Sequence, residues 1–211
     1  MTRIQKTVFI LVALIALVVG LTVSKVLNSQ HQLDPTQLLD AGIVVLPQSR
    51  TVPSLSLTDQ DGEAVKLNEL DGQWTLLFFG YTFCPDICPT TLAELRQLNG
   101  MLPDAVRDQL RIILVSVDPN RDTPEKLKEY LGYFNAGFQG LTGPLDDIQT
   151  LANGVGIPFI PGDTSKENYT VDHSGNLVLI GPDGRQQGFI RSPLRVQKLA
   201  EQLPELVKQA E

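Results

Sequence analysis

Two short, largely apolar runs constrain the fold of this chain more than any other feature. Residues 74–79 read WTLLFF, and residues 111–117 read RIILVSV. Runs of this length, in which polar and apolar residues do not alternate, are typical of strands that are buried on both faces of a sheet. The sequence therefore predicts two central strands, one near residue 76 and one near residue 114.

Each run is followed by a segment that favours a helix. After the first run, Thr91 and Glu94 are placed as a capping box, and leucines recur at helical spacing. After the second run, Thr123 can cap a helix that has Pro124 at its first position. Strands that alternate with helices predict an α/β domain around a mixed sheet. The leucines after the first run are Leu92, Leu95, Leu98 and Leu102.

The flanking segments complete this pattern. Residues 54–67 alternate around an Asp61-Gly62 turn, which predicts a hairpin ahead of the first buried strand. The order of elements matches thioredoxin, so we expect a thioredoxin-like α/β sandwich with an extra N-terminal β-hairpin. The later elements that we expect are a strand at 138–142, a helix at 144–153, two or three strands within 169–190 joined by turns at Ser174-Gly175 and Asp183-Gly184, and a closing helix at 193–208 interrupted or kinked at Pro204.

A long apolar segment precedes the domain. Residues 7–23 carry no charge, and the segment extends to residue 27 around a single lysine, Lys25. At about 1.5 Å per residue this length is enough to cross a hydrocarbon core of about 30 Å. Arg3 and Lys6 precede the segment, which predicts a cytoplasmic N-terminus and a domain on the other side of the membrane.

A cleaved signal peptide has a similar layout, with a shorter apolar region and a small-residue cleavage site. Here the run is long, and the sequence SKVLNSQ that follows contains no clear Ala-x-Ala. We therefore expect a single-pass protein of a bacterial-type inner membrane, with its domain on the periplasmic or extracytoplasmic side. The predicted parts are a cytoplasmic N-terminus (1–6), a transmembrane anchor (7–27), a tether (28–50) and the domain (51–211).

The exported part of the chain is acidic. All 24 acidic residues but only 14 of the 17 basic residues follow residue 27. Affinity for nucleic acid depends on clustered lysine and arginine, so we do not expect a nucleic-acid partner.

The two cysteines, Cys84 and Cys88, follow the first buried strand and precede its helix. Ligands bind at this edge of open α/β sheets, and a helix N-terminus favours the thiolate, which is both the nucleophile and the metal ligand. The spacing permits either a disulfide or a shared metal ion. A purely structural disulfide would close a very short loop and constrain the unfolded chain little, so we favour redox or metal chemistry.

The chain contains two histidines, His31 in the predicted tether and His173 in the segment VDHSGN. A lone histidine is more often a surface or hydrogen-bonded residue than a ligand. In a thioredoxin-like fold, however, this late segment passes over the active cysteines. Two thiolates and one imidazole suit Cu(I), whereas structural zinc normally takes four protein ligands. The predicted domain contains no further cysteine or histidine, which favours copper.

Three segments together closely resemble the Sco/SenC family, the thioredoxin-fold copper chaperones of cytochrome c oxidase assembly. They are FFGYTFCPDICPTTLAEL, VSVDPNRDTPEKLKEY and YTVDHSGNLVLIGPDG. The resemblance implies that Cys84, Cys88 and His173 bind one copper ion, as Cu(I) or Cu(II). It also implies an upstream copper donor and, as acceptor, the dinuclear copper centre of oxidase subunit II. We expect the protein to be a monomer.

Four acidic residues match positions in the family's motifs. Asp86 lies inside the cysteine motif, and Asp172 precedes the histidine, which it could orient if it does not simply cap a turn. We interpret Asp118 and Asp122 mainly as loop and cap residues that could also face a partner.

Other classes of function share the same residues. A thiol:disulfide oxidoreductase that reduces the oxidase's copper-binding cysteines would use Cys84 and Cys88 without a histidine ligand, although the usual redox motif has one residue fewer between its cysteines. A peroxiredoxin-like peroxidase is less compatible, because no clear activating arginine stands beside the first cysteine. A copper- or redox-sensing module remains a third alternative.

Overall fold

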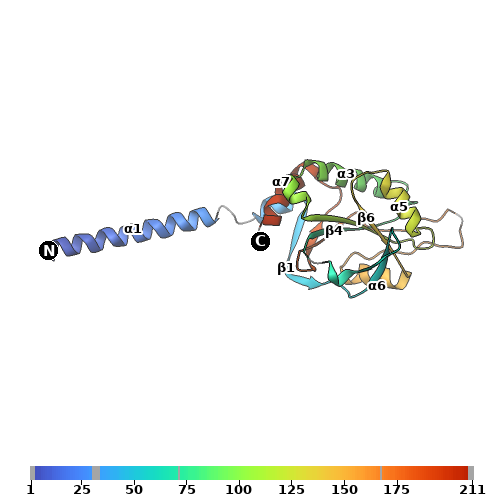
Figure 1. Cartoon of the computed structure of the whole chain (residues 1–211), viewed down its shortest axis with the longest axis horizontal. Coiled ribbons are helices and arrows are strands. Elements are labelled where there is room, and N and C mark those ends of the chain that lie inside the picture. Colours follow the sequence, from blue (N-terminus) through green and yellow to red (C-terminus); the bar gives the residue numbers. More distant parts are fainter. Residues whose placement is uncertain (1–2, 30–33, 71, 167, 209–211) are drawn as a thin grey trace. The chain divides into compact units, whose positions relative to one another are not determined.

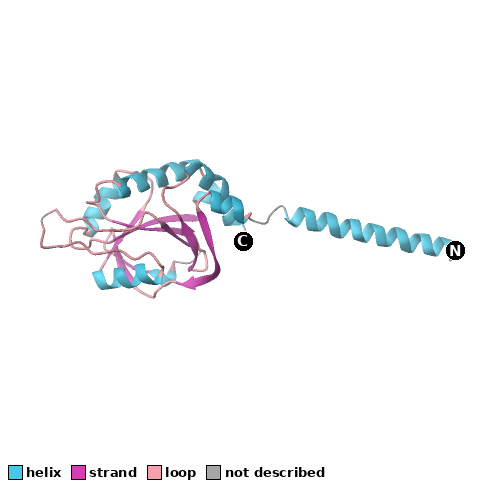
Figure 2. Cartoon of the chain, turned by 180° about the vertical axis from the view of Figure 1, so that it is seen from behind, coloured by secondary structure: helices cyan, strands magenta, loops and turns pink. Residues whose placement is uncertain are grey.

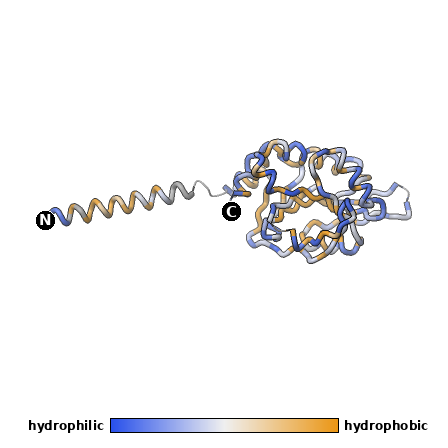
Figure 3. Tube along the Cα trace, viewed as in Figure 1, coloured by the Kyte–Doolittle hydropathy of each residue, from blue (hydrophilic) through white to orange (hydrophobic). Residues whose placement is uncertain are grey.

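The computed structural model describes residues 3–29, 34–70, 72–166 and 168–208. The chain divides into two units, one that ends at Asp34 and one that begins at Pro35 (Figure 1). The first unit contains helix α1 (Arg3–Ser29). Its segment Arg3–Ser24 is long and apolar enough to cross a membrane, a property that signal sequences share (Figure 3). The predicted apolar helix is therefore present, and its role as an anchor stays a prediction.

The second unit is built on a mixed sheet with the strand order β1-β8-β7-β4-β5-β6-β2-β3. Strands β4 and β5 are parallel, as are β5 and β6, and the remaining pairs are antiparallel. The strands are β1 (Ile43–Thr51), β2 (Ser56–Asp59), β3 (Ala64–Lys66), β4 (Trp74–Gly80), β5 (Leu110–Ser116), β6 (Gln139–Thr142), β7 (Leu177–Ile180) and β8 (Arg185–Ile190).

Helices cover both faces of this sheet, as Figures 1 and 2 show. Helices α3, α5 and α7 lie on one face, and α6 lies on the other. The helices are α2 (Pro35–Asp40), α3 (Ile87–Met101), α4 (Asp104–Arg107), α5 (Pro124–Gly132), α6 (Leu145–Gly154) and α7 (Val196–Lys208), with a 3-10 turn at Leu67–Glu69. The predicted α/β thioredoxin-like architecture with extra strands is confirmed.

The core lies where the sequence predicts it. All seven residues of β4 are buried, and Leu92, Leu95 and Leu98 of α3 are completely buried as well. Burial of one leucine side chain stabilises the fold by roughly 1.5–3 kcal/mol. Thr123 caps α5 by accepting a hydrogen bond from the backbone N–H of Lys126, as predicted. This packing holds the carboxyl end of β4, and therefore the cysteine segment, in a rigid setting.

The start of α3 differs from the sequence prediction. The helix begins at Ile87 after Asp86, so Thr91 is a buried residue inside the helix, and its predicted role in a capping box with Glu94 is wrong. Only residues 81–86 separate the end of β4 from the first residue of the helix. As a consequence, Cys88 lies in the first turn of the helix.

Most of the predicted tether, residues 28–50, belongs to the second unit, which begins at Pro35. Strand β1 pairs antiparallel with β8 along the edge of the sheet, and α2 precedes it, so the folded unit includes much of residues 28–50. Because β1 is an edge strand with only Ile43 fully buried, its sequence lacks the regular alternation that identifies a strand.

The C-terminal region differs in two further respects. Residues 169–176 form no strand, and their β-type pairing is limited to an isolated bridge between Asp172 and Ile160. Strands β7 and β8 are joined by the predicted Asp183-Gly184 turn, in which Gly184 has a φ of 68°. Helix α7 starts at Val196 and ends at Lys208. Pro204, the residue predicted to interrupt or kink the closing helix, lies inside it.

Candidate metal centre

The two cysteines lie where the central strand meets helix α3. Strand β4 ends at Gly80, and Cys84 lies in the short segment before the helix, where its side chain is 9% exposed. Cys88 is in the first turn of α3 and is completely buried. Its backbone N–H donates to Cys84 Sγ across 3.4 Å. An amide in the first turn of a helix has no partner within the helix, so it is free to stabilise a thiolate.

A glycine makes room for the second sulfur. If Gly80 carried a Cβ, that atom would lie 2.8 Å from Cys88 Sγ and 3.0 Å from side-chain atoms of Leu114 and Phe78. The backbone N–H of Tyr81 donates to the same sulfur across 3.4 Å. The end of β4 thus lies directly against Cys88 Sγ. This contact was not predicted, because a glycine at a strand end has no distinctive sequence pattern.

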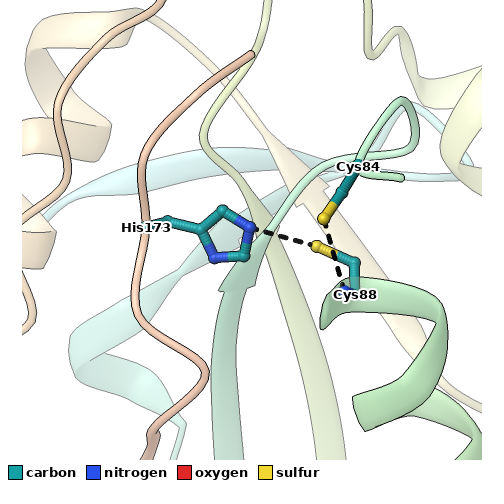
Figure 4. A group of neighbouring side chains, drawn as sticks. All are labelled: Cys84, Cys88 and His173. Carbon is teal, nitrogen blue, oxygen red and sulfur yellow. Dashed lines mark hydrogen bonds between the residues drawn. The ribbon is translucent and has the colours of Figure 1, made fainter. Parts of the chain in front are cut away.

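His173 approaches the cysteines from the long loop between α6 and β7, as Figure 4 shows. Its Nε2 lies 3.3 Å from Cys88 Sγ, and its Nδ1 lies 3.2 Å from the backbone oxygen of Ser174. Because a carbonyl only accepts, Nδ1 is the donor in the contact with Ser174, which leaves Nε2 as the ring nitrogen that faces the sulfur. The ring packs edge-on against Tyr81 and Phe78, with centroids 5.5 and 6.0 Å away.

The arrangement brings together the three donors that the sequence selected. The sulfur atoms of Cys84 and Cys88 and a ring nitrogen of His173 all lie within 4.8 Å of one another. Two sulfurs and one imidazole nitrogen are soft donors in a low-coordinate set, which fits Cu(I) better than a hard cation. His31, the other histidine, lies outside the described residues.

The two thiols have opposite protonation preferences. A hydrogen bond from the Cys88 thiol lowers the pKa of Cys84 to about 4, against the effect of burial, and contacts with His173 and with the amides of Asp86 and Cys88 lower it further. The same hydrogen bond, together with burial, raises the pKa of Cys88. Cys84 is therefore the thiolate of the pair at neutral pH, and Cys88 retains its proton.

Comparison with known proteins agrees with this geometry. The sequence model of the SCO1/SenC family matches residues 45–208. This chain belongs to the SCO1/SenC family. It is 48% identical over 176 residues to a candidate copper-binding protein of Stutzerimonas stutzeri, an alignment that covers 83% of this chain and 86% of that one.

Solved structures of SCO1/SenC proteins are similar as well. A copper-bound structure of Bradyrhizobium japonicum ScoI is 34% identical with a TM-score of 0.66, and the match covers 73% of this chain and 98% of that chain. Copper-bound yeast Sco1 is 28% identical with a TM-score of 0.70, covering 75% of this chain and 89% of that chain.

The acids that match the SCO1/SenC motif near the site are exposed. Asp86 and Asp172 line the same pocket as Cys84 and His173. Asp86 precedes α3 without a side-chain capping bond, and Asp172 uses its backbone to pair with Ile160. The Nδ1 of His173 contacts the backbone oxygen of Ser174, and the role of Asp172 in orienting the imidazole stays a prediction. The two carboxylates therefore form the rim of the pocket.

The other two SCO1/SenC acids are buried, so the prediction that they could face a partner is wrong. Asp118 is 2% exposed and Asp122 is 0% exposed. Asp122 accepts hydrogen bonds from Thr82 and Ser116, and Asp118 accepts from Tyr169 and Arg121. These carboxylates satisfy buried donors of neighbouring loops, a role that their sequence motif did not reveal.

Proposed function

We propose that this protein binds one copper ion through Cys84, Cys88 and His173, and that it delivers the ion to the dinuclear copper site of cytochrome c oxidase during assembly. The observation that carries the proposal is the convergence of two sulfurs and one imidazole nitrogen within 4.8 Å. Family membership supports the copper and the oxidase, and the copper-bound structures of similar proteins support the metal.

The residues perform separate tasks in loading. Cys84 offers a thiolate at neutral pH, and His173 offers a neutral Nε2 lone pair whose direction is maintained by the Nδ1 contact with Ser174. Cys88 must release its proton to become a ligand, so loading releases a proton and requires both thiols in the reduced state. Its amide contact from Tyr81 stabilises the resulting thiolate.

Release is favoured by the open side of the site. The pocket around Cys84 is lined by exposed residues of two loops, including Pro85 and Asp172, so a donor atom from a partner can approach the ion there. A three-coordinate Cu(I) can accept an incoming thiolate or imidazole before it loses its own ligand. Transfer then proceeds by ligand exchange on the side of Cys84 and His173, because both line the pocket and Cys88 is completely buried. Helix α1 serves as the membrane anchor in this proposal and places the domain on the extracytoplasmic side.

The full-length chain, reduced and purified in detergent, tests the copper proposal directly. We expect one Cu(I) per chain, loss of tight binding in Cys84→Ser and Cys88→Ser, and weaker binding in His173→Ala. A His173→Ala protein with unchanged copper affinity would contradict the three-donor site. Delivery is tested by oxidase activity in a deletion strain that carries each variant, at low and at high copper.

A second function is favoured by one specific observation, two free cysteine sulfurs within 4.8 Å of each other at the start of a helix, where the pKa of Cys84 is lowered. In a thiol:disulfide oxidoreductase, Cys84 would attack a partner disulfide and form a mixed disulfide, releasing one partner thiolate. Cys88 would then lose its proton and attack Cys84, leaving a Cys84–Cys88 disulfide and a reduced partner. Copper-free reduction of a disulfide substrate, unaffected by His173→Ala, would support this function over copper delivery.

A further inference from the structure

Residues 116–122, which comprise the last residue of strand β5 and the loop that follows it, contact both of the segments that carry the proposed ligands. We call this segment the 116–122 loop. One of its carboxylates contacts the cysteine segment, and its other carboxylate and its arginine contact the histidine loop.

The arm toward the cysteines is Asp122. Its buried carboxylate accepts from the Thr82 backbone N–H at 3.0 Å and from the Thr82 hydroxyl at 2.6 Å. The Ser116 hydroxyl donates to the same carboxylate across 2.6 Å. Thr82 stands two residues before Cys84, so these bonds determine where the cysteine segment leaves the sheet. An unpaired buried donor is costly, which makes this arrangement strongly preferred.

The arm toward the histidine consists of Asp118 and Arg121, and both contact Tyr169. The Tyr169 hydroxyl donates to Asp118 across 2.6 Å. The Arg121 guanidinium lies 3.6 Å from the centroid of the Tyr169 ring and donates to the Tyr169 carbonyl across 3.0 Å. Arg121 also forms an ion pair with Asp118, and the Arg121 side chain is only 18% exposed. Tyr169 is therefore held at its hydroxyl, its ring and its backbone.

The residues between Tyr169 and His173 are also held by hydrogen bonds, so the position of Tyr169 restricts the position of His173. The backbone N–H of Val171 donates to the Tyr81 hydroxyl across 3.2 Å, and Asp172 makes two backbone hydrogen bonds with Ile160. Only three residues then lie between a firmly held tyrosine and His173. The Arg121 guanidinium also lies 4.8 Å from the ring centroid of Phe83, the residue before Cys84, so the same cation contacts both segments.

We propose that the 116–122 loop is a positioning element that sets the distance between His173 and the two cysteines. Asp122 places the cysteine segment, and Asp118 with Arg121 places the histidine loop through Tyr169. The inference rests on the proposed function only in taking copper as the ligand, because the positioning exists in the metal-free protein. A loop that merely stabilises the fold would lower stability without a selective effect on His173.

The test of the histidine arm is Tyr169→Phe, which removes only the hydroxyl that donates to Asp118. We expect Cu(I) affinity to fall by roughly 2- to 10-fold, the scale of one hydrogen bond. In a His173→Ala background the same substitution should cause no further loss, because its effect acts through the imidazole. In the metal-free protein, amide hydrogen exchange at Val171 should accelerate. Tyr133→Phe is the matched control, since Tyr133 is 76% exposed on the surface, and it should change neither quantity.

Two results would overturn the histidine arm. One is an equal loss of affinity from Tyr169→Phe in both backgrounds, and the other is unchanged exchange at Val171. If the wild-type chain bound no copper, the proposed function would fail, but the exchange measurement on the metal-free protein would still decide whether Tyr169 positions the loop.

The test of the cysteine arm is Thr82→Val, which keeps the shape of the side chain but removes the hydroxyl that donates to Asp122. We expect a loss of Cu(I) affinity that adds to the loss from His173→Ala, together with unchanged exchange at Val171. If Thr82→Val instead accelerated exchange at Val171, or lost its effect in the His173→Ala background, the two arms would not act separately and the proposal would be wrong.

Discussion

Cys84 and Cys88 lie at the junction of a buried strand and a helix, whereas His173 lies in a long loop between α6 and β7. The cysteine half owes its geometry to elements that are close in sequence, because only three residues lie between the two cysteines. The histidine half depends on contacts with loops that are far away in the chain. The site therefore combines a preformed pair of sulfur donors with a third donor, the imidazole, that other loops must position.

Removal of a cysteine should break the preformed half and have the largest effect. Cys88→Ser replaces the buried sulfur that lies within 4.8 Å of Cys84 Sγ and 3.3 Å from His173 Nε2. We expect copper affinity to fall by more than about 100-fold, beyond the range observed when only the partner of a metal ligand is removed. Competition with a Cu(I) chelator measures this loss. Binding within tenfold of wild type would show that Cys88 is not a ligand.

Removal of the imidazole should have a smaller effect, because the two sulfurs remain in place. For His173→Ala we expect a loss of affinity of about 10- to 100-fold, with stoichiometry preserved at high copper. The same chelator competition measures it, alongside the ultraviolet sulfur-to-copper absorption. If His173→Ala were as damaging as Cys88→Ser, the division into a preformed pair and a positioned third donor would be wrong.

A glycine tests how rigid the cysteine half is. Gly80→Ala places a methyl group 2.8 Å from Cys88 Sγ, in a densely packed region between Leu114 and Phe78. We expect a loss of about 1–3 kcal/mol in the free energy of unfolding, together with weaker copper binding. Gly100→Ala in helix α3 is the matched control, because its Cβ would meet no atom within 4 Å, and it should be neutral or stabilising. Denaturant unfolding separates the two, and equal outcomes would refute the close fit.

The smallest expected effect is a change in the pH dependence of Cys84 alkylation, to which Cys88 and His173 contribute unequally. The pKa of Cys84 is lowered to about 4, so its alkylation rate should change little between pH 8 and pH 6. An ordinary thiol slows by about tenfold per pH unit below its pKa. Cys88→Ser removes the largest cause of the shift and His173→Ala a smaller one. Both should therefore move the profile toward higher pH, with Cys88→Ser moving it further. Mass spectrometry of the alkylated chain at each pH measures the profile.

Much of the fold follows from short-range patterns. The buried runs of β4 and β5, the cap of α5 at Thr123 and the turn at Asp183-Gly184 each depend on residues within a few positions of one another. The start of α3 and the edge strand β1 did not follow, because tertiary contacts decided them. An edge strand gains its stability from the strand beside it, which its own sequence does not reveal.

The sequence by itself determined which atoms this protein can offer a metal: two cysteines four residues apart at the end of a buried strand, and one histidine in the domain. Only the tertiary structure decided that these atoms meet. Cys88 and His173 are 85 residues apart, Thr82 and Asp122 are 40 apart, and Asp118 and Tyr169 are 51 apart. Such contacts arise when the sheet brings the ends of separate strands to one edge, and their partners are chosen by packing and by the need to satisfy buried polar groups, which no local pattern encodes.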